Sequence, residues 1–207
     1  MTRLLTAFLC LCMAPMAWAH PHIFVDTQLR IHVDADGLAH KVEMTWHYDD
    51  FFTLLILEDE GLDPDADGLL TPEEEARLKG FDLEVWPEGF EGDLYVFSGD
   101  RKLDLPRPEP VSATVENGRI VSTQTRDIPP SPIADLTIRQ YDPTYYVAYT
   151  VREVVVFFAD CQTEIAAPDL AAADAAVKKE LDTMPEDMFE IMKPGAHYAQ
   201  TIRFQCA

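Results

Sequence analysis

Apolar and polar residues alternate along much of this chain, with the period of two that half-buried β-strands show. The alternation is clearest in residues 23–33 and 38–48. Between them, Asp36-Gly37 is typical of the tight turn that closes a β-hairpin. These residues therefore predict an antiparallel pair of strands near the N-terminus.

A two-residue turn would set the register of this hairpin and pair Val33 with His40. The apolar faces of the two strands then coincide. This supports the register, because a shift by one residue would turn one apolar face toward solvent. The same register places Asp26 opposite His47 on the polar face.

Further strand signals follow along the chain. They fall in residues 81–86, 93–98, 101–105, 111–116, 119–125, 135–139, 145–152, 154–158 and 199–206. Prolines in 106–110 and 129–132 predict breaks. Residues 168–184 are rich in alanine, acidic at their start and basic later, which predicts an amphipathic helix. Strands dominate and two or three helices are expected, so the fold class is α+β with a mainly antiparallel β-sheet.

Residues 63–74 depart from this pattern and match a calcium-binding loop of the EF-hand type. Such a loop takes carboxylate oxygens at its first, third and fifth positions, a backbone carbonyl at the seventh, often a water at the ninth, and a bidentate Glu at the last. The residues at these positions are Asp63, Asp65, Asp67, Leu69, Thr71 and Glu74. Gly68 stands where the loop must turn sharply. The alternative is a solvated acidic turn, which would not need Gly68 and Glu74 in this register.

Helix signals flank this loop. The apolar residues at 51–57 predict a short, mostly buried helix before it. Pro72 is placed for the first turn of a second helix, which should end at Gly80. Together they predict an EF-hand-like insert over about residues 50–80. No second such loop occurs in the sequence, so we expect a structural calcium ion rather than a calcium switch.

The N-terminal residues have the features of a secretory signal peptide. Arg3 precedes an apolar run at 4–13, and Ala17–Ala19 match a cleavage site. The apolar run is too short to span a bilayer, and no other stretch is long and apolar enough. We therefore expect residues 1–19 to be a signal peptide and residues 20–207 to be a single exported domain that does not insert into a membrane.

The charge and the cysteines limit the function further. A formal charge of −21 excludes binding of nucleic acid or anionic lipid through a general field, and it concentrates cations near the surface. Cys161 and Cys206 are the cysteines that remain after cleavage. In an oxidising compartment we expect them to form a disulfide that ties the C-terminal strand to an inner strand. Two separate buried thiols are the alternative.

The expected mature N-terminus suggests a second metal site. Cleavage would make His20 the first residue, so its α-amine and ring nitrogen can chelate one ion. Pro21 lacks an N–H, which excludes the square-planar site that uses a deprotonated second amide. The candidate ligands are His20 and His22, with His47 held by Asp26, and these suit Zn²⁺, Ni²⁺, Co²⁺ or Cu²⁺. The alternative is solvated histidines and an ordinary cross-strand pair.

Several motifs resemble one bacterial family. They are His20–Asp26, Trp46–Phe52, the loop at 63–74, Gly89–Tyr95 and Tyr141–Tyr146. The mature chain is similar to the periplasmic family called domain of unknown function 1007. Its members are often labelled as periplasmic components of an ABC-type transport system and tend to be encoded beside inner-membrane nickel, cobalt or zinc permeases. The resemblance implies a periplasmic location, such a permease as partner, and a metal site that includes His20, His22 and Asp26.

These observations favour a periplasmic accessory protein that binds divalent metal, passes Zn²⁺, Ni²⁺ or Co²⁺ to an inner-membrane permease, and holds calcium as a structural ion. One alternative is a calcium-stabilised docking or scaffold module without a transition-metal role. A second is a copper enzyme that uses the N-terminal His. The sequence contains no G-x-S-x-G, H-E-x-x-H or Cys–His signature, so we predict no enzymatic activity.

Overall fold

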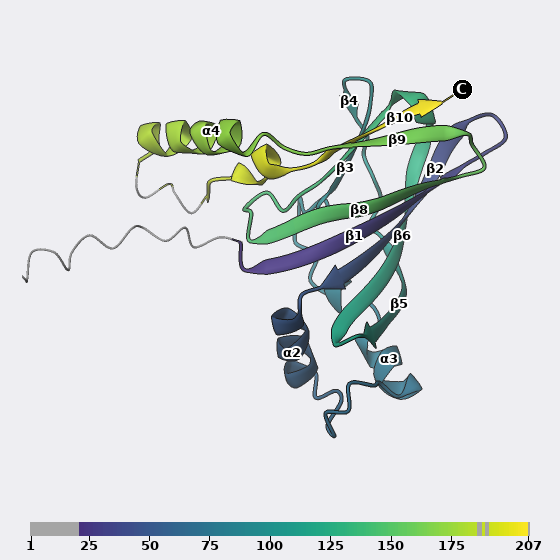
Figure 1. Cartoon of the computed structure of the whole chain (residues 1–207), viewed down its shortest axis with the longest axis vertical. Helices are drawn as coiled ribbons and strands as arrows, with labels where there is room; N and C mark the ends of the chain where they lie inside the picture. Colours follow the sequence, from purple (N-terminus) through teal and green to yellow (C-terminus); the bar gives the residue numbers. More distant parts are fainter. Residues whose placement is uncertain (1–20, 186–187, 189–190, 207) are drawn as a thin grey trace, which may run out of the picture.

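The computed structural model describes residues 21–185, 188 and 191–206, and these form two five-stranded sheets with three α-helices (Figure 1). The first sheet has the order β5-β6-β2-β1-β8. Its strands are β1 (Ile23–Val33), β2 (Leu38–Tyr48), β5 (Glu109–Glu116), β6 (Arg119–Pro132) and β8 (Val147–Phe157). The second sheet has the order β4-β3-β7-β10-β9. Its strands are β3 (Leu94–Ser98), β4 (Arg101–Lys102), β7 (Leu136–Gln140), β9 (Cys161–Ala166) and β10 (Thr201–Cys206).

The helices lie outside the sheets. Among the described residues, the α-helices are α2 (Asp50–Asp59), α3 (Pro72–Leu78) and α4 (Leu170–Thr183), and the 3₁₀ helices include η2 (Phe81–Leu83), η3 (Ile133–Asp135) and η5 (Pro194–Tyr198). β1 and β8 pair in parallel, and the other strand pairs of the described residues are antiparallel. The predicted α+β class with a mainly antiparallel sheet is therefore confirmed. None of the described helices is long and apolar enough to cross a membrane.

The turn between β1 and β2 differs from the predicted two-residue turn. Asp34 donates its backbone N–H to the carbonyl of Leu38 (2.9 Å), which leaves three residues in the turn. Gly37 takes a left-handed conformation there (φ +77°), which costs glycine no steric strain. Val33 consequently pairs with Ala39, one residue earlier than predicted. A bulge next to Val33 then restores the predicted register along the rest of the hairpin.

Three later predictions are wrong. Residues 81–86, predicted as a strand, form η2 and a loop. The break predicted at 129–132 is part of β6, and these prolines are tolerated because β5 pairs with β6 only as far as Thr125. The strands predicted at 145–152 and 154–158 are one strand, β8, whose pairing with β1 contains a bulge.

Apolar residues form two clusters. The larger one fills the space between the two sheets, since β1 and β2 of the first sheet and β3, β7 and β10 of the second all contribute buried side chains. The smaller one lies where α2 and α3 pack beyond one end of the first sheet (Figure 1). This second cluster supports both the loop at 63–74 and the cleft described below.

Helix α2 is less buried than predicted. Only Thr53 and Leu57 of this helix are buried, whereas Phe51, Leu54 and Leu55 are exposed, Phe51 at 77%. The reason is its position, because α2 packs against the end of a sheet and so contacts the core with one narrow face. Thr53 anchors that face by accepting a hydrogen bond from the backbone N–H of Ile120 in β6 (2.9 Å).

The predicted disulfide between Cys161 and Cys206 is confirmed, with an S–S distance of 2.05 Å. It joins β9 to β10, which lie next to each other. β9 is an edge strand of its sheet, not the inner strand that we expected. The predicted signal peptide at 1–19 lies outside the described residues.

Candidate functional site

The loop between α2 and α3 gathers three carboxylates. Oxygen atoms of Asp63, Asp65 and Asp67 all lie within 4.8 Å of one another. In the part of the chain that the structure describes, this is the one group of three or more His, Cys, Asp or Glu side chains close enough to share a metal ion. Asp65 and Asp67 are exposed and Asp63 is half-buried. The structure thus brings together three of the six predicted calcium ligands.

Backbone N–H groups hold these carboxylates inside the loop. Asp63 accepts hydrogen bonds from the N–H of Asp67 (3.0 Å) and of Gly68 (3.1 Å). The carboxylate of Asp67 accepts from the N–H of Leu69 (2.8 Å), whose side chain is exposed. Gly68 has a φ of +77°, the left-handed turn expected at that position.

Glu74 links the two ends of the loop. Its Oε2 accepts from the N–H and the hydroxyl of Thr71, both at 2.8 Å, and Thr71 Oγ1 accepts in return from the N–H of Glu74. This capping box starts α3. The other carboxylate oxygen of Glu74, Oε1, accepts a hydrogen bond from the backbone N–H of Asp63 at the start of the loop (3.1 Å). These hydrogen bonds, foremost that from the Thr71 backbone, lower the pKa of Glu74.

The second predicted site lies on the polar face of β1 and β2. Asp26 lies opposite His47, as predicted. The Asp26 carboxylate, however, accepts from Arg152 Nε of β8 (2.8 Å) and from an Arg119 nitrogen of β6 (3.2 Å). Burial raises the pKa of Asp26, but the two guanidinium groups outweigh burial and hold this pKa below its usual value. Asp26 is therefore engaged by arginines.

The histidines predicted for this site do not form a metal-binding cluster with Asp26 in the described residues. His22 donates its backbone N–H to the carbonyl of Tyr146 (2.9 Å), and the two rings lie 4.8 Å apart. The Nε2 atom of His47 is buried and has no hydrogen-bond partner in the described part of the chain. His22, Asp26 and His47 do not form a group of three ligand atoms within 4.8 Å. His20, the remaining predicted ligand, lies outside the described residues.

A cleft of about 300 Å³ opens between α2, the end of the first sheet and the segment at 81–93. Its walls are mostly aromatic. The rings are Trp46, Tyr48, Phe52, Phe81, Trp86, Phe90 and Tyr149. They contact one another, as Trp46 lies 5.3 Å from Tyr149 and Tyr48 lies 5.1 Å from Phe52 between ring centroids. Sequence patterns did not indicate this cleft.

Asp93 lies among these rings and is only 6% exposed. Its Oδ2 accepts a hydrogen bond from the Tyr149 hydroxyl (2.9 Å). Its Oδ1 is buried without a hydrogen-bond partner in the described residues. Burial, together with the nearby charge of Asp142, raises the pKa of Asp93 to about 7 despite the Tyr149 hydrogen bond.

A second carboxylate, Asp82, lines the same cleft. Its Oδ2 accepts from the hydroxyls of Ser122 (2.6 Å) and Tyr48 (3.2 Å). Burial raises the pKa of Asp82, which these two hydroxyls only partly offset. The cleft therefore holds one buried carboxylate, Asp93, and one half-buried carboxylate, Asp82, whose side-chain hydrogen-bond partners are neutral hydroxyls.

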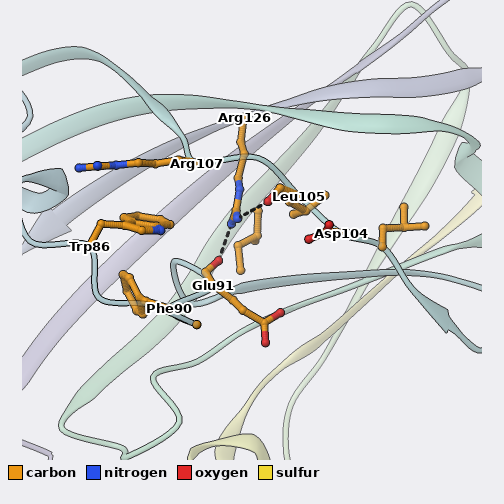
Figure 2. A pocket seen from close by; sticks show the side chains of 10 residues that line it. Trp86, Phe90, Glu91, Asp104, Leu105, Arg107 and Arg126 are labelled. Atoms are coloured by element: carbon orange, nitrogen blue, oxygen red, sulfur yellow. Dashed lines mark hydrogen bonds between the residues drawn. The ribbon is translucent and has the colours of Figure 1, made fainter.

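Trp86 and Phe90 also line a second cavity, of about 190 Å³ (Figure 2). There the buried Arg126 donates to backbone carbonyls of the neighbouring segments at 2.6 and 3.1 Å, and Arg107 lies over the Trp86 ring at 5.1 Å. A Cβ atom at Gly92 would lie 2.6 Å from Trp86. Two arginines and one glycine thus fix the segment that walls the cleft.

The motif at Tyr141–Tyr146 is structural. Asp142 accepts hydrogen bonds from the backbone N–H groups of Thr144, Tyr146 and Val147 and from the Thr144 hydroxyl. It therefore organises the turn that leads into β8. A catalytic role is not needed to explain its place in the sequence.

The family model described as "Protein of unknown function (DUF1007)" matches residues 5–206, nearly the whole sequence. No curated protein matches the chain.

Proposed function

We propose that this chain, which belongs to the DUF1007 family, is an exported accessory protein that binds calcium at residues 63–74 and serves a membrane permease for divalent metal. The observation that supports calcium binding is the convergence of Asp63, Asp65 and Asp67 within 4.8 Å. The role beside a permease, and the periplasmic location, rest on the resemblance described for the sequence.

Calcium suits this loop better than a transition metal. Three carboxylates this close repel one another, and a cation between them relieves that repulsion. All the ligands on offer are oxygens, which Ca²⁺ prefers, whereas Zn²⁺, Ni²⁺ and Cu²⁺ favour nitrogen or sulfur. Glu74 adds a fourth carboxylate, because its Oε1 already contacts the start of the loop at the Asp63 N–H.

The ion would hold the α2–α3 insert on the end of the sheet. Leu57 and Leu62 before the loop and Leu78 after it are all buried in the second cluster. Because the loop joins these side chains, an ion that orders it stabilises their packing. At a calcium concentration ten times the Kd, the gain is about 1.4 kcal/mol.

The test uses exported protein treated with a chelator and then titrated with calcium, followed by calorimetry and thermal unfolding. We expect one equivalent to bind, with a Kd of roughly 10⁻⁴–10⁻³ M, and to raise Tm. The double variant Asp63→Asn, Asp65→Asn should lose both effects. Asp100→Asn, in the exposed turn after β3, is the matched control. A calcium-dependent rise in Tm that is equal in the double variant would refute the proposal.

We further propose that the transported metal, Zn²⁺, Ni²⁺ or Co²⁺, binds at the mature N-terminus through His20 and His22, with His47 as third ligand. Two observations support this. His22 is exposed at the start of β1, and the His47 Nε2 on the adjacent strand has no hydrogen-bond partner among the described residues. Asp26 is paired with two arginines, so this proposal does not use it as a ligand.

Elemental analysis and metal titration test this second proposal, on protein whose mature N-terminus is verified as His20 by mass spectrometry. One equivalent of Zn²⁺, Ni²⁺ or Co²⁺ that is lost in His22→Ala and in His47→Ala supports delivery to a permease. His40→Ala, exposed on the same hairpin, is the control. Binding that survives both substitutions refutes this ligand set.

A docking module without a transition-metal role is the competing proposal. It is favoured by the exposed apolar side chains of α2, which are Phe51, Leu54 and Leu55. If calcium is the one metal that binds, the docking proposal replaces the proposal of metal delivery. Loss of permease function in a Phe51→Ser, Leu54→Ser variant that still binds calcium would support it, and unchanged function would count against it.

A further inference from the structure

We propose that the aromatic cleft beside α2 is a binding site for a small organic cation that carries an ammonium group. This inference is independent of calcium binding and of metal delivery. It rests on charge, on the rings of the wall and on buried polar atoms that have no partner.

The charge of the cleft is uncompensated. Asp82 and Asp93 both line it, and among the described residues neither takes part in a salt bridge. Their partners are the hydroxyls of Tyr48, Ser122 and Tyr149. A buried carboxylate without a positive partner is costly, so a cation gains more here than at the surface.

The walls suit an organic cation. The faces of Trp, Tyr and Phe rings attract ammonium groups, most strongly where water is excluded, and cages of such rings bind choline and methylated lysine in other proteins. Trp46 and Tyr149 are neighbours in one wall (5.3 Å), and Trp86 and Phe90 are neighbours in another (4.7 Å). The volume, about 300 Å³, is at the lower end for small-molecule sites.

Several residues that line the cleft carry buried polar atoms without a partner within the described part of the chain. Trp46 is 5% exposed and its Nε1 donor is unpaired, while Gln124 is 2% exposed and both its amide atoms are unpaired. Oδ1 of Asp93 is the third such group. A buried polar atom without a partner is costly, because it has lost its hydrogen bonds to water. The residues that carry these atoms all line the cleft, so a polar ligand bound there would lie near groups that lack partners.

A bare metal ion fits less well. Asp82 and Asp93 belong to no group of three metal-binding side chains among the described residues. The remaining wall is largely aromatic, and such rings cannot replace the oxygen ligands that Ca²⁺ or Mg²⁺ requires. The cleft therefore offers a largely aromatic enclosure with two carboxylates in its wall, which matches an ammonium ion with attached carbon.

The experiment compares cations with neutral molecules of the same shape. The pairs are choline with 3,3-dimethylbutan-1-ol, and n-butylammonium with butan-1-ol. Binding is measured at pH 8 by calorimetry and by intrinsic fluorescence, with calcium saturating. Trp46 and Trp86 both line the cleft, so their fluorescence reports on it directly. We expect saturable binding of at least one cation, and binding of its neutral counterpart at least ten-fold weaker.

Variants locate the binding. Asp93→Asn and Asp82→Asn should each weaken the cation at least ten-fold while the neutral molecules are unaffected. Asp104→Asn, exposed at the second cavity, should bind as the wild type does. If one cleft variant does not fold, the other still tests the site. The proposal is overturned if neither cation binds or if the neutral molecules bind equally well. It is also overturned if the affinity is unchanged in both variants, or if Ca²⁺ or Mg²⁺ alone competes.

The affinity should also depend on pH. Asp93 must lose its proton to pair with a cation, so binding should be several-fold weaker at pH 6 than at pH 8. The ionisable groups that act on Asp93 are Asp142 and the phenols of Tyr48, Tyr95, Tyr141 and Tyr149. Burial raises the pKa of all four phenols, so they stay neutral over this range. An affinity that is the same at both pH values counts against Asp93 as the partner.

Discussion

Replacing Asp93 by Asn should change the free energy of unfolding, relative to the wild type, more favourably at pH 8 than at pH 5. The pKa of Asp93 is about 7 in the folded protein against an ordinary value of 3.8. The folded state therefore holds a proton that the unfolded state releases, and the stability contributed by this group falls as pH rises from about 4 to about 7. An Asn cannot ionise, so the variant escapes this loss.

The size of the effect follows from the pKa difference. Each unit corresponds to about 1.36 kcal/mol, so the full cost of ionising Asp93 is about 4 kcal/mol above pH 7. Between pH 5 and pH 8 the free energy of unfolding of the variant should rise by about 2–3 kcal/mol relative to the wild type. Asn brings its own cost of about 1–3 kcal/mol, because its NH₂ group replaces an oxygen that has no partner. The variant should therefore be about as stable as the wild type at pH 5 and more stable at pH 8.

Asn is a close match in other respects. Asp93 has a φ of +56°, a left-handed conformation that Asn tolerates well. The Asn carbonyl can still accept from the Tyr149 hydroxyl. Urea unfolding at pH 5, 6, 7 and 8, with calcium in every buffer, gives the difference between variant and wild type. This difference cancels the contributions of the other carboxylates. Asp104→Asn, which removes one exposed carboxylate, is the control.

A difference for Asp93→Asn that stays constant from pH 5 to pH 8 would refute the reasoning. So would a difference that changes in the opposite direction. Either result would mean that Asp93 is ionised in the folded protein at low pH, and that a cation or water compensates its charge.

Three further changes test the packing. The double variant Cys161→Ser, Cys206→Ser should lose about 4 kcal/mol in urea unfolding, since the disulfide closes a segment with a sequence separation of 45, while reductant should leave the variant unchanged. Gly92→Ala should lower the free energy of unfolding by about 1–3 kcal/mol and shift the fluorescence of Trp86, because the added Cβ would lie 2.6 Å from that ring. An unshifted spectrum would contradict this contact. Thr53→Val should lower the free energy of unfolding by about 1–3 kcal/mol, measured by thermal unfolding, because it leaves a buried N–H of β6 without its acceptor. An unchanged stability would argue that water replaces the hydroxyl.

Local patterns predicted the elements that depend on local interactions. The alternation at 23–33 and 38–48 gave both strands, because a strand with one buried face must alternate. Pro72 and Gly80 predicted the start and the end of α3, and composition predicted α4. The turn at Gly37 was mispredicted, since one added residue is compatible with the same apolar pattern when a bulge compensates it.

The candidate sites also differ in how much of each could be recognised from local sequence. Asp63, Asp65 and Asp67 could be recognised because a calcium loop draws its ligands from one short segment, so their spacing alone carries the signal. For Asp26 the sequence predicted its position opposite His47 but not its partners. Arg119 and Arg152 lie on the strands to either side of that hairpin, and nothing in the residues near Asp26 indicates them.

The sequence by itself therefore determined the first hairpin, the acidic loop and the two cysteines that pair, since each depends on residues near in the chain or few in number. The tertiary structure alone decided the cleft. Asp93, Tyr48 and Tyr149 come from three separate segments and meet because α2 and the segment at 81–93 cover the end of the first sheet. Their burial sets the pKa of Asp93, and burial is a property of the packed molecule that no local pattern contains.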